Sequence, residues 1–175
     1  DIQGRKLNTT LINSTIDRLN ANGGGTLFFP TGTYLTGSIH MKSNITLELE
    51  AGATLKFSEN FDDFLPYVEV RHEGIMMKSF QPLIYAVDAE NITIKGEGTL
   101  DGNASYENWW KGEGREKIGG AFRPRMIFLN HCENVTVQGL TVQNSPAWNL
   151  HPYFSNHTRW IDLKVLNPKQ SPNTD

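Results

Sequence analysis

The spacing of hydrophobic residues changes near residue 25. Between residues 8 and 22, apolar side chains recur every three or four positions, which predicts an amphipathic helix that starts at Asn8 or Thr9. The glycines at 23–25 end this helix, because glycine readily adopts the left-handed conformation found after helix C-termini. We expect the helix to cover an open edge of the structure that follows.

After residue 25, apolar residues come in short runs bounded by Gly, Asn, Ser or Pro. The first runs are 26–29, 33–35, 39–41, 45–49 and 53–57. Runs this short do not suit a sandwich, but they suit a solenoid in which each coil adds one strand to several parallel sheets. The pattern predicts an all-β fold, a parallel β-helix with a short N-terminal capping helix, in a single domain over residues 1–175.

A pattern of Asn, Ile or Val, Thr and an aliphatic residue occurs at 44–47, 91–94 and 134–137. An Asn at a sharp turn bonds the neighbouring backbone, and stacked Asn residues extend that bonding along a solenoid. The same Asn-x-Thr triplets are acceptor sequences for glycosylation, which is the alternative use of these positions.

Two further features concern the arrangement of the coils. A Ser-Pro pair at 145–146 recurs at 171–172, and in that register Asn149 and Asp175 occupy the same position in adjacent coils. The segments 58–82 and 101–122 interrupt the strand pattern. Insertions in solenoids collect on one face, which is often the binding face.

Composition and charge exclude several classes of protein. The 175 residues carry 16 Lys and Arg against 19 Asp and Glu, a net charge of -3, whereas a dedicated nucleic-acid binder needs a basic surface. The single cysteine, Cys132, forms no disulfide framework within one chain. No apolar run is long enough to span a membrane. The histidines show no metal-ligand spacing, so we expect neither a metal nor another cofactor.

Several motifs follow one another along the chain. They are the stretches 23–34, 98–102, 108–110 and 123–127, and then 134–148 leading to Ser-Pro-Asn-Thr-Asp at 171–175. In this order they resemble the polygalacturonases of glycoside hydrolase family 28. The resemblance implies a right-handed parallel β-helix and a secreted or periplasmic enzyme. Such an enzyme cleaves α-1,4-galacturonosyl linkages of polygalacturonate or pectin oligosaccharides by an inverting mechanism.

The chain also departs from that family. There, Asn-Thr-Asp is normally followed by Gly, and an Asp-Asp pair, a His-Gly motif and an Arg-x-Lys motif lie further downstream. None of these follows Asp175, the last residue of the sequence. We therefore expect the N-terminal part of a longer enzyme, truncated at the C-terminal side of its β-helix and inactive by itself. The absence of a signal peptide leaves secretion open, because a mature secreted protein also lacks one.

The resemblance also points to a catalytic residue and to cations for the substrate. It gives Asp175 the role of helping to activate the attacking water, where the alternative is an ordinary solvated residue. A polygalacturonate substrate needs cations for its carboxylates, and Arg is the residue that pairs carboxylates bidentately. Arg123 is the first candidate, and alternation places Arg125 on the same side of the chain.

Polar and aromatic residues gather shortly before these motifs end. Asn149, His151 and Tyr153 fall on one face of a predicted strand, where amide and imidazole groups bond sugar hydroxyls. Trp148 has the opposite parity and is expected to pack inward. Trp109 and Trp110 either stack on a sugar or lie buried under the insertion, and burial is the commoner environment of Trp.

Three functions remain open at this point. The first is the hydrolase, and the two insertions favour attack at the chain end, an exo mode, because they can wall off one end of a cleft. The second is a pectate lyase-like β-helix, which needs acidic calcium ligands and a basic proton abstractor. The third is a non-catalytic carbohydrate-binding or adhesive β-helix.

Overall fold

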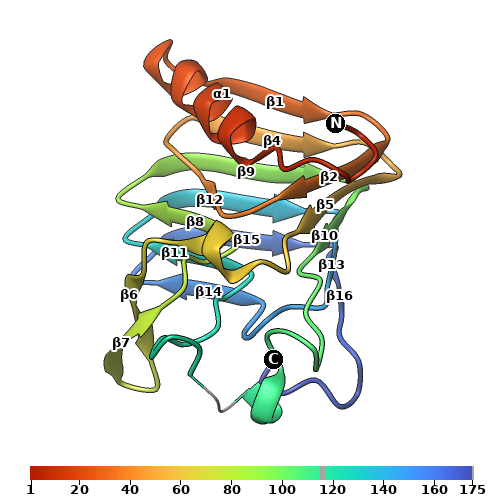
Figure 1. Cartoon of the computed structure of the whole chain (residues 1–175). Coiled ribbons are helices and arrows are strands. Elements are labelled where there is room, and N and C mark those ends of the chain that lie inside the picture. Colours follow the sequence, from red (N-terminus) through yellow and green to blue (C-terminus); the bar gives the residue numbers. More distant parts are fainter. Residues whose placement is uncertain (115–116, 175) are drawn as a thin grey trace.

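The fold is that of a computed structural model, which describes residues 1–114 and 117–174. Parallel strands stack in coils along one axis, and helix α1 (Thr9–Ala21) covers the first coil (Figure 1). Asn8 precedes the helix, but its side-chain amide donates to the carbonyl of Leu35 at 3.1 Å instead of capping the helix. Among the described residues, no helix is long and apolar enough to cross a membrane.

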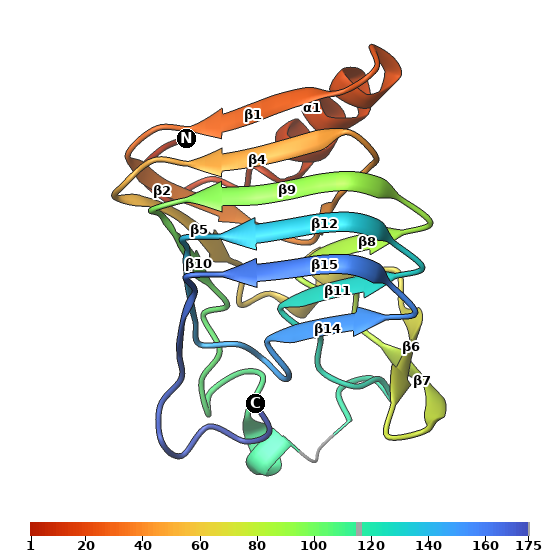
Figure 2. The same cartoon turned by 180° about the vertical axis from the view of Figure 1, so that it is seen from behind.

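Three parallel sheets form the walls of the solenoid (Figures 1 and 2). The first contains β1 (Gly25–Phe29), β4 (Ile45–Leu49), β9 (Glu90–Gly96), β12 (Glu133–Gln138) and β15 (Asn156–Ile161). The second contains β2 (Gly32–Thr36), β5 (Ala53–Phe57), β10 (Thr99–Asp101), β13 (Thr141–Gln143) and β16 (Lys164–Leu166). The third contains β3 (Ile39–His40), β8 (Ile84–Val87), β11 (Ile127–Asn130) and β14 (Leu150–Tyr153). The predicted parallel β-helix is confirmed.

Strand register gives the length of each coil. Leu27 pairs with Leu47, an advance of 20 residues, and Val137 pairs with Trp160, an advance of 23. The two coils between them, which contain the insertions, advance 47 and 43 residues. The 26-residue offset expected for the Ser-Pro pairs concerns turns between strands, so no strand pair tests it.

The core lies inside the solenoid and is built from one face of each strand. In the three central strands of the first sheet, inward positions are aliphatic and wholly buried, as at Leu47, Ile94 and Val137, which are directly paired neighbours. Alternation along a strand sends every second side chain to solvent, which explains the period of two in the sequence. Burial of this continuous aliphatic column is the main stabilising contribution of the fold.

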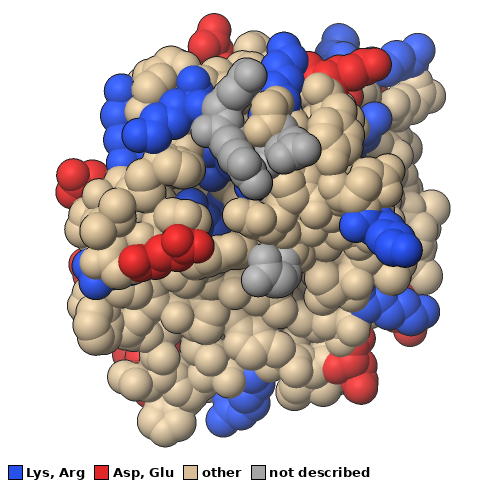
Figure 3. Space-filling model, turned by 90° about the horizontal axis from the view of Figure 1, so that it is seen from below, with Lys and Arg blue, Asp and Glu red and all other residues tan. Residues whose placement is uncertain are grey.

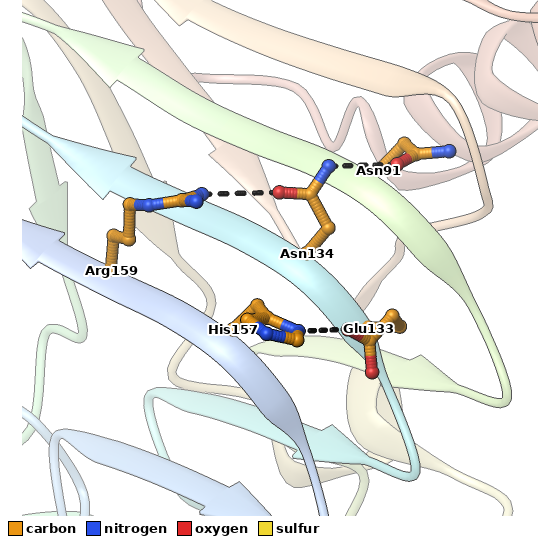
Figure 4. Close-up of polar contacts among 5 residues, drawn as sticks. All are labelled: Asn91, Glu133, Asn134, His157 and Arg159. Carbon is orange, nitrogen blue, oxygen red and sulfur yellow. Dashed lines mark hydrogen bonds and ion pairs between the residues drawn. The ribbon is translucent and has the colours of Figure 1, made fainter.

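The repeated asparagines form a hydrogen-bonded ladder where each coil enters the first sheet. The amide of Asn91 donates to Asn44 Oδ1 at 3.1 Å, and the amide of Asn134 donates to Asn91 Oδ1 at 2.8 Å. Figure 4 shows the end of the ladder, where Arg159 Nη1 donates to Asn134 Oδ1 at 3.1 Å and His157 contacts Glu133. Each of the three asparagines has a positive φ, between 54° and 63°. The stacking role expected from the sequence is confirmed.

Asn91 gives a stability prediction. Asn91→Ala is expected to lower the free energy of unfolding by about 2 kcal/mol. The substitution removes two hydrogen bonds, and it places alanine at φ 55°, a left-handed conformation that alanine disfavours. Asn91→Gly removes the same bonds but tolerates that φ, so its expected loss is about 1 kcal/mol. Urea unfolding of both variants measures the difference. Equal losses would show that backbone conformation at this turn contributes nothing.

The two insertions pack against each other beside the third sheet. The first contains a 3-10 turn, η1 (Phe61–Phe64), and the antiparallel hairpin β6 (Val68–His72) and β7 (Ile75–Ser79). The second contains the turn η2 (Lys111–Gly114) and Trp109. The centroid of the Trp109 ring lies 4.4 Å from that of Phe61 and 5.1 Å from that of Phe80. Trp109 and Trp110 are both buried, so burial is the outcome for this pair.

Candidate functional site

A pocket of about 270 Å³ lies where the hairpin β6–β7, the segment after the second insertion and the turn before β14 meet. Figure 1 shows the hairpin and β14 near the same lower end as the C-terminus. Two arginines, three rings and few acidic groups line the pocket. The lining residues are His72, Glu73, Phe122, Arg123, Arg125, Ala147, Trp148 and Asn173.

Arg125 is a buried cation at this pocket, with 2% of its surface exposed. Its Nη2 donates to the carbonyl of Arg71 at 3.2 Å and to His72 Nδ1 at 2.9 Å, and its Cζ lies 5.0 Å from the centroid of the Trp148 ring. Its Nε is buried without a hydrogen-bond partner in the described part of the chain, and no carboxylate pairs with the guanidinium there. Burial, together with the charge of Arg123, lowers the pKa of Arg125 to about 10, so it stays charged at neutral pH.

His72 reaches the pocket from the end of strand β6. Its ring stacks on Trp148 with centroids 5.0 Å apart and lies 5.4 Å from the ring of Phe122. Burial first, and then the charge of Arg125, lower the pKa of His72. The imidazole is therefore neutral at neutral pH, and it adds polarity rather than charge to the pocket.

Arg123 ties two turns together beside the pocket. Its Nη1 donates to the carbonyls of Pro146 and Pro172, each at 2.6 Å. These prolines belong to the two Ser-Pro pairs found in the sequence. Arg123 thus fixes the turn 171–174 against the turn before β14, a contact that sequence reasoning did not anticipate.

The turn that precedes Asp175 is held by side-chain amides. The carbonyl of Thr174 accepts hydrogen bonds from Asn149 and from Asn167, the second at 3.3 Å. Ser171 Oγ and Thr174 Oγ1 lie 2.6 Å apart. Asn149 is buried, and its Oδ1 has no hydrogen-bond partner within residues 1–114 and 117–174. The predicted catalytic residue Asp175 itself lies outside the described residues.

His151 and Tyr153 lie on the outer face of β14, next to the pocket. The ring of His151 is 5.1 Å from that of Trp148 and 4.9 Å from that of Phe128, and Tyr153 stacks on Phe128 at 6.3 Å. Burial, followed by the charge of Arg125, lowers the pKa of His151 to about 4. Its Nδ1 is buried and has no hydrogen-bond partner in the described structure, so the hydrogen-bonding capacity of this nitrogen is unused there.

The described residues that line the pocket carry more positive than negative charge, although the whole chain carries -3. Lys117 adds a third cation, with Nζ 5.1 Å from the centroid of the Phe122 ring. Among the lining residues that the structure describes, Glu73 is the acidic one. Figure 3 views this lower end of the molecule, where Lys and Arg side chains gather at the upper left. Of these cations, Arg125 is buried and has no carboxylate partner among the described residues, and such a charge is costly unless a ligand supplies the anion.

Comparison with known proteins identifies the family. The model of "Glycosyl hydrolases family 28" matches residues 20–175. The chain belongs to this family. It is 30% identical to a grapevine (Vitis vinifera) "Probable polygalacturonase" over 98% of the chain, and 28% identical to an "Endo-polygalacturonase" of Pectobacterium parmentieri over 83%. It spans 36% and 38% of the lengths of these two relatives.

A solved structure of this family gives the same picture of the fold. The crystal structure of an exopolygalacturonase from Thermotoga maritima superposes with a TM-score of 0.91 and 33% sequence identity. The match covers 100% of this chain and 46% of that one. The fold of the whole described chain therefore corresponds to part of the fold of that exopolygalacturonase.

Within this family 28 chain, the pocket differs from the sequence expectation in two ways. The prediction that Trp148 packs inward is wrong, because its ring lines the pocket. The prediction assumed that side chains alternate between inside and outside at Trp148. Strand β14 begins only at Leu150, so Trp148 lies in a turn where this alternation does not hold. Sequence reasoning also missed His72 and Glu73. Their signal is weak, a His-Glu-Gly turn within an insertion.

Proposed function

We propose that the complete protein hydrolyses α-1,4-galacturonosyl linkages of polygalacturonate or pectin oligosaccharides. One observation carries the proposal: Arg125 is buried at a pocket with no carboxylate partner among the described residues. A uronate ring supplies the missing anion, and the Trp148 and Phe122 rings supply apolar surface for its carbon skeleton. Membership of family 28 supports the same substrate.

The proposed reaction is an inverting hydrolysis. One carboxylic acid protonates the leaving glycosidic oxygen, and a carboxylate about 6.5–9.5 Å away activates a water on the opposite face of the sugar. Asp175 is proposed to help activate this water, and the resemblance assigns the acid and a second base to an Asp-Asp pair beyond residue 175. The chain thus carries part of the catalytic set, and the 175 residues alone are expected to be inactive.

Proposed contacts with the substrate are divided among several elements. Arg125 binds a carboxylate, and His151 and Tyr153 offer polar atoms from β14. Arg123 and Asn149, both proposed from the sequence as substrate-binding, also hold the turn before Asp175 through backbone carbonyls. Any contact that these two make with a sugar is therefore coupled to the position of that turn.

We propose that attack occurs at the chain end. His72 and Glu73 come from the first insertion and Phe122 from the second, so both insertions contribute walls to one pocket. A walled pocket accepts a terminal ring more readily than the middle of a polymer. Polygalacturonate is a polymer that does not enter the cytoplasm. We therefore propose that the protein is secreted or periplasmic.

Product analysis of polygalacturonate treated with the complete protein tests the proposal. The hydrolase is expected to generate new reducing ends, with monomers or dimers accumulating first if it acts at the chain end. A pectate lyase-like activity would instead release products with the ultraviolet absorbance of an unsaturated ring. Binding without either product would favour the non-catalytic carbohydrate-binding function.

Glu73 provides a prediction about charge at the pocket. Its side chain is 73% exposed, and its carboxylate opposes an anionic substrate. Glu73→Gln is expected to lower KM by about twofold at low ionic strength, and salt should remove the difference by screening. Glu69→Gln, the same change at an exposed position near the base of the hairpin, serves as the control. A salt-independent effect, or an equal effect of both variants, would contradict the electrostatic explanation.

A further inference from the structure

The hairpin β6–β7 lies outside the three parallel sheets, yet it delivers a polar ring to the pocket. His72 ends strand β6, and its side chain is 21% exposed. The two strands of the hairpin pair antiparallel, with Val68 opposite Ser79 at one end and His72 opposite Ile75 at the other. The solenoid places Arg125 and Trp148, whereas the insertion places the ring that contacts both.

The contact with Arg125 fixes which nitrogen of His72 carries the proton. A guanidinium can only donate, so Nδ1, 2.9 Å from Arg125 Nη2, is the acceptor. A neutral imidazole that accepts at Nδ1 carries its proton on Nε2. This Nε2–H has no hydrogen-bond partner in the described structure, since Glu73 Oε1 is 4.0 Å away.

Arg125 is held on one side by this ring. In the described structure, the guanidinium makes two hydrogen bonds, one to His72 and one to the Arg71 carbonyl. Nη2 donates both of them. Both partners belong to strand β6. The hairpin therefore sets the orientation of the buried cation, and the rest of the guanidinium is left for a ligand.

We propose that His72 is a positioning and specificity-determining residue of the pocket. Its Nδ1 orients Arg125, and its Nε2–H donates a hydrogen bond to the carboxylate of the bound uronate. The proposal rests on the proposed function, because it assumes that a uronate occupies this pocket. Together the two residues recognise a free carboxylate and disfavour its methyl ester, which carries no charge.

Two variants separate hydrogen bonding from packing. His72→Phe keeps an aromatic ring between Trp148 and Phe122 but removes both nitrogens. His72→Asn restores an acceptor near the position of Nδ1 and lacks Nε2–H. Met76→Ala, at an exposed position of the same hairpin, is the control for disturbance of the hairpin.

Steady-state kinetics and binding to the complete protein measure the outcome. His72→Phe is expected to raise KM for trigalacturonate by about tenfold with kcat within about threefold, since one hydrogen bond to a charged group is lost and Arg125 is loosened. The preference for digalacturonate over its methyl ester should fall by a similar factor. His72→Asn should lie between His72→Phe and wild type. Unchanged KM and unchanged ester preference in His72→Phe would overturn the proposal.

Nitrogen NMR of the wild-type ring tests the proposal without a substitution. The expected state is Nδ1 unprotonated and Nε2 protonated, with the Nε2 signal shifting when digalacturonate is added. A proton on Nδ1 would contradict the contact with Arg125, even if the protein binds no sugar. Wild-type protein that neither binds nor cleaves oligogalacturonate would instead overturn the proposed function, so the two failures are distinguishable.

Discussion

Asp175→Asn in the complete protein is expected to lower kcat on polygalacturonate by about 10³-fold while KM stays within about twofold. Asparagine preserves the size of the side chain but cannot accept the proton of an attacking water. The expectation rests on the resemblance of Asn-Thr-Asp at 173–175 to the catalytic motif of family 28. In the described part of that motif, the carbonyl of Thr174 is held by Asn149 and Asn167.

Reducing-end assays at saturating substrate measure this loss. Asp162→Asn is the matched control, because Asp162 is an exposed residue in the turn after β15 and undergoes the same chemical change. Its kcat should equal that of the wild type. A kcat for Asp175→Asn within tenfold of wild type would remove Asp175 from the catalytic step.

Arg125→Met is expected to lower kcat/KM by about a hundredfold, mainly through KM. The variant removes the buried cation proposed to bind a carboxylate, and a charge-assisted hydrogen bond of this kind contributes about 1.5–3 kcal/mol. Arg125→Lys keeps the charge but not the planar donor group, so its loss should be closer to tenfold. Kinetics on trigalacturonate distinguish the two variants.

The same Arg125→Met variant is expected to fold at least as stably as the wild type. Arg125 is 2% exposed and has no carboxylate partner among the residues described, so its charge is desolvated without an ion pair. Replacing such a charge by an apolar side chain of similar length removes that cost. Lower activity with an unchanged or higher melting temperature would identify a residue kept for binding. A large fall in melting temperature would indicate a structural role instead.

The sequence was sufficient for the repeating part of the fold. The triplets that begin at Asn44, Asn91 and Asn134 recur because each turn needs a residue that tolerates positive φ and bonds its neighbour. The strand runs follow from alternation against a continuous core. These are local requirements, and a sequence displays local requirements directly.

The pocket was less accessible from the sequence because it depends on tertiary contacts. His72 lies 53 residues from Arg125 along the chain, and the packing of two insertions brings them together. Neither residue has a spacing pattern that links it to the other. Trp148 shows the same limit, since alternation along a strand says nothing about a side chain in a turn.

The most direct test of the account compares the binding of digalacturonate with that of the corresponding neutral disaccharide, by calorimetry with the complete protein. The two ligands share the sugar framework and differ in their carboxylates. If the pocket around Arg125 and His72 recognises a uronate, digalacturonate should bind at least about tenfold more tightly, and Arg125→Met should abolish most of that difference. Equal affinities for the two disaccharides would contradict the account.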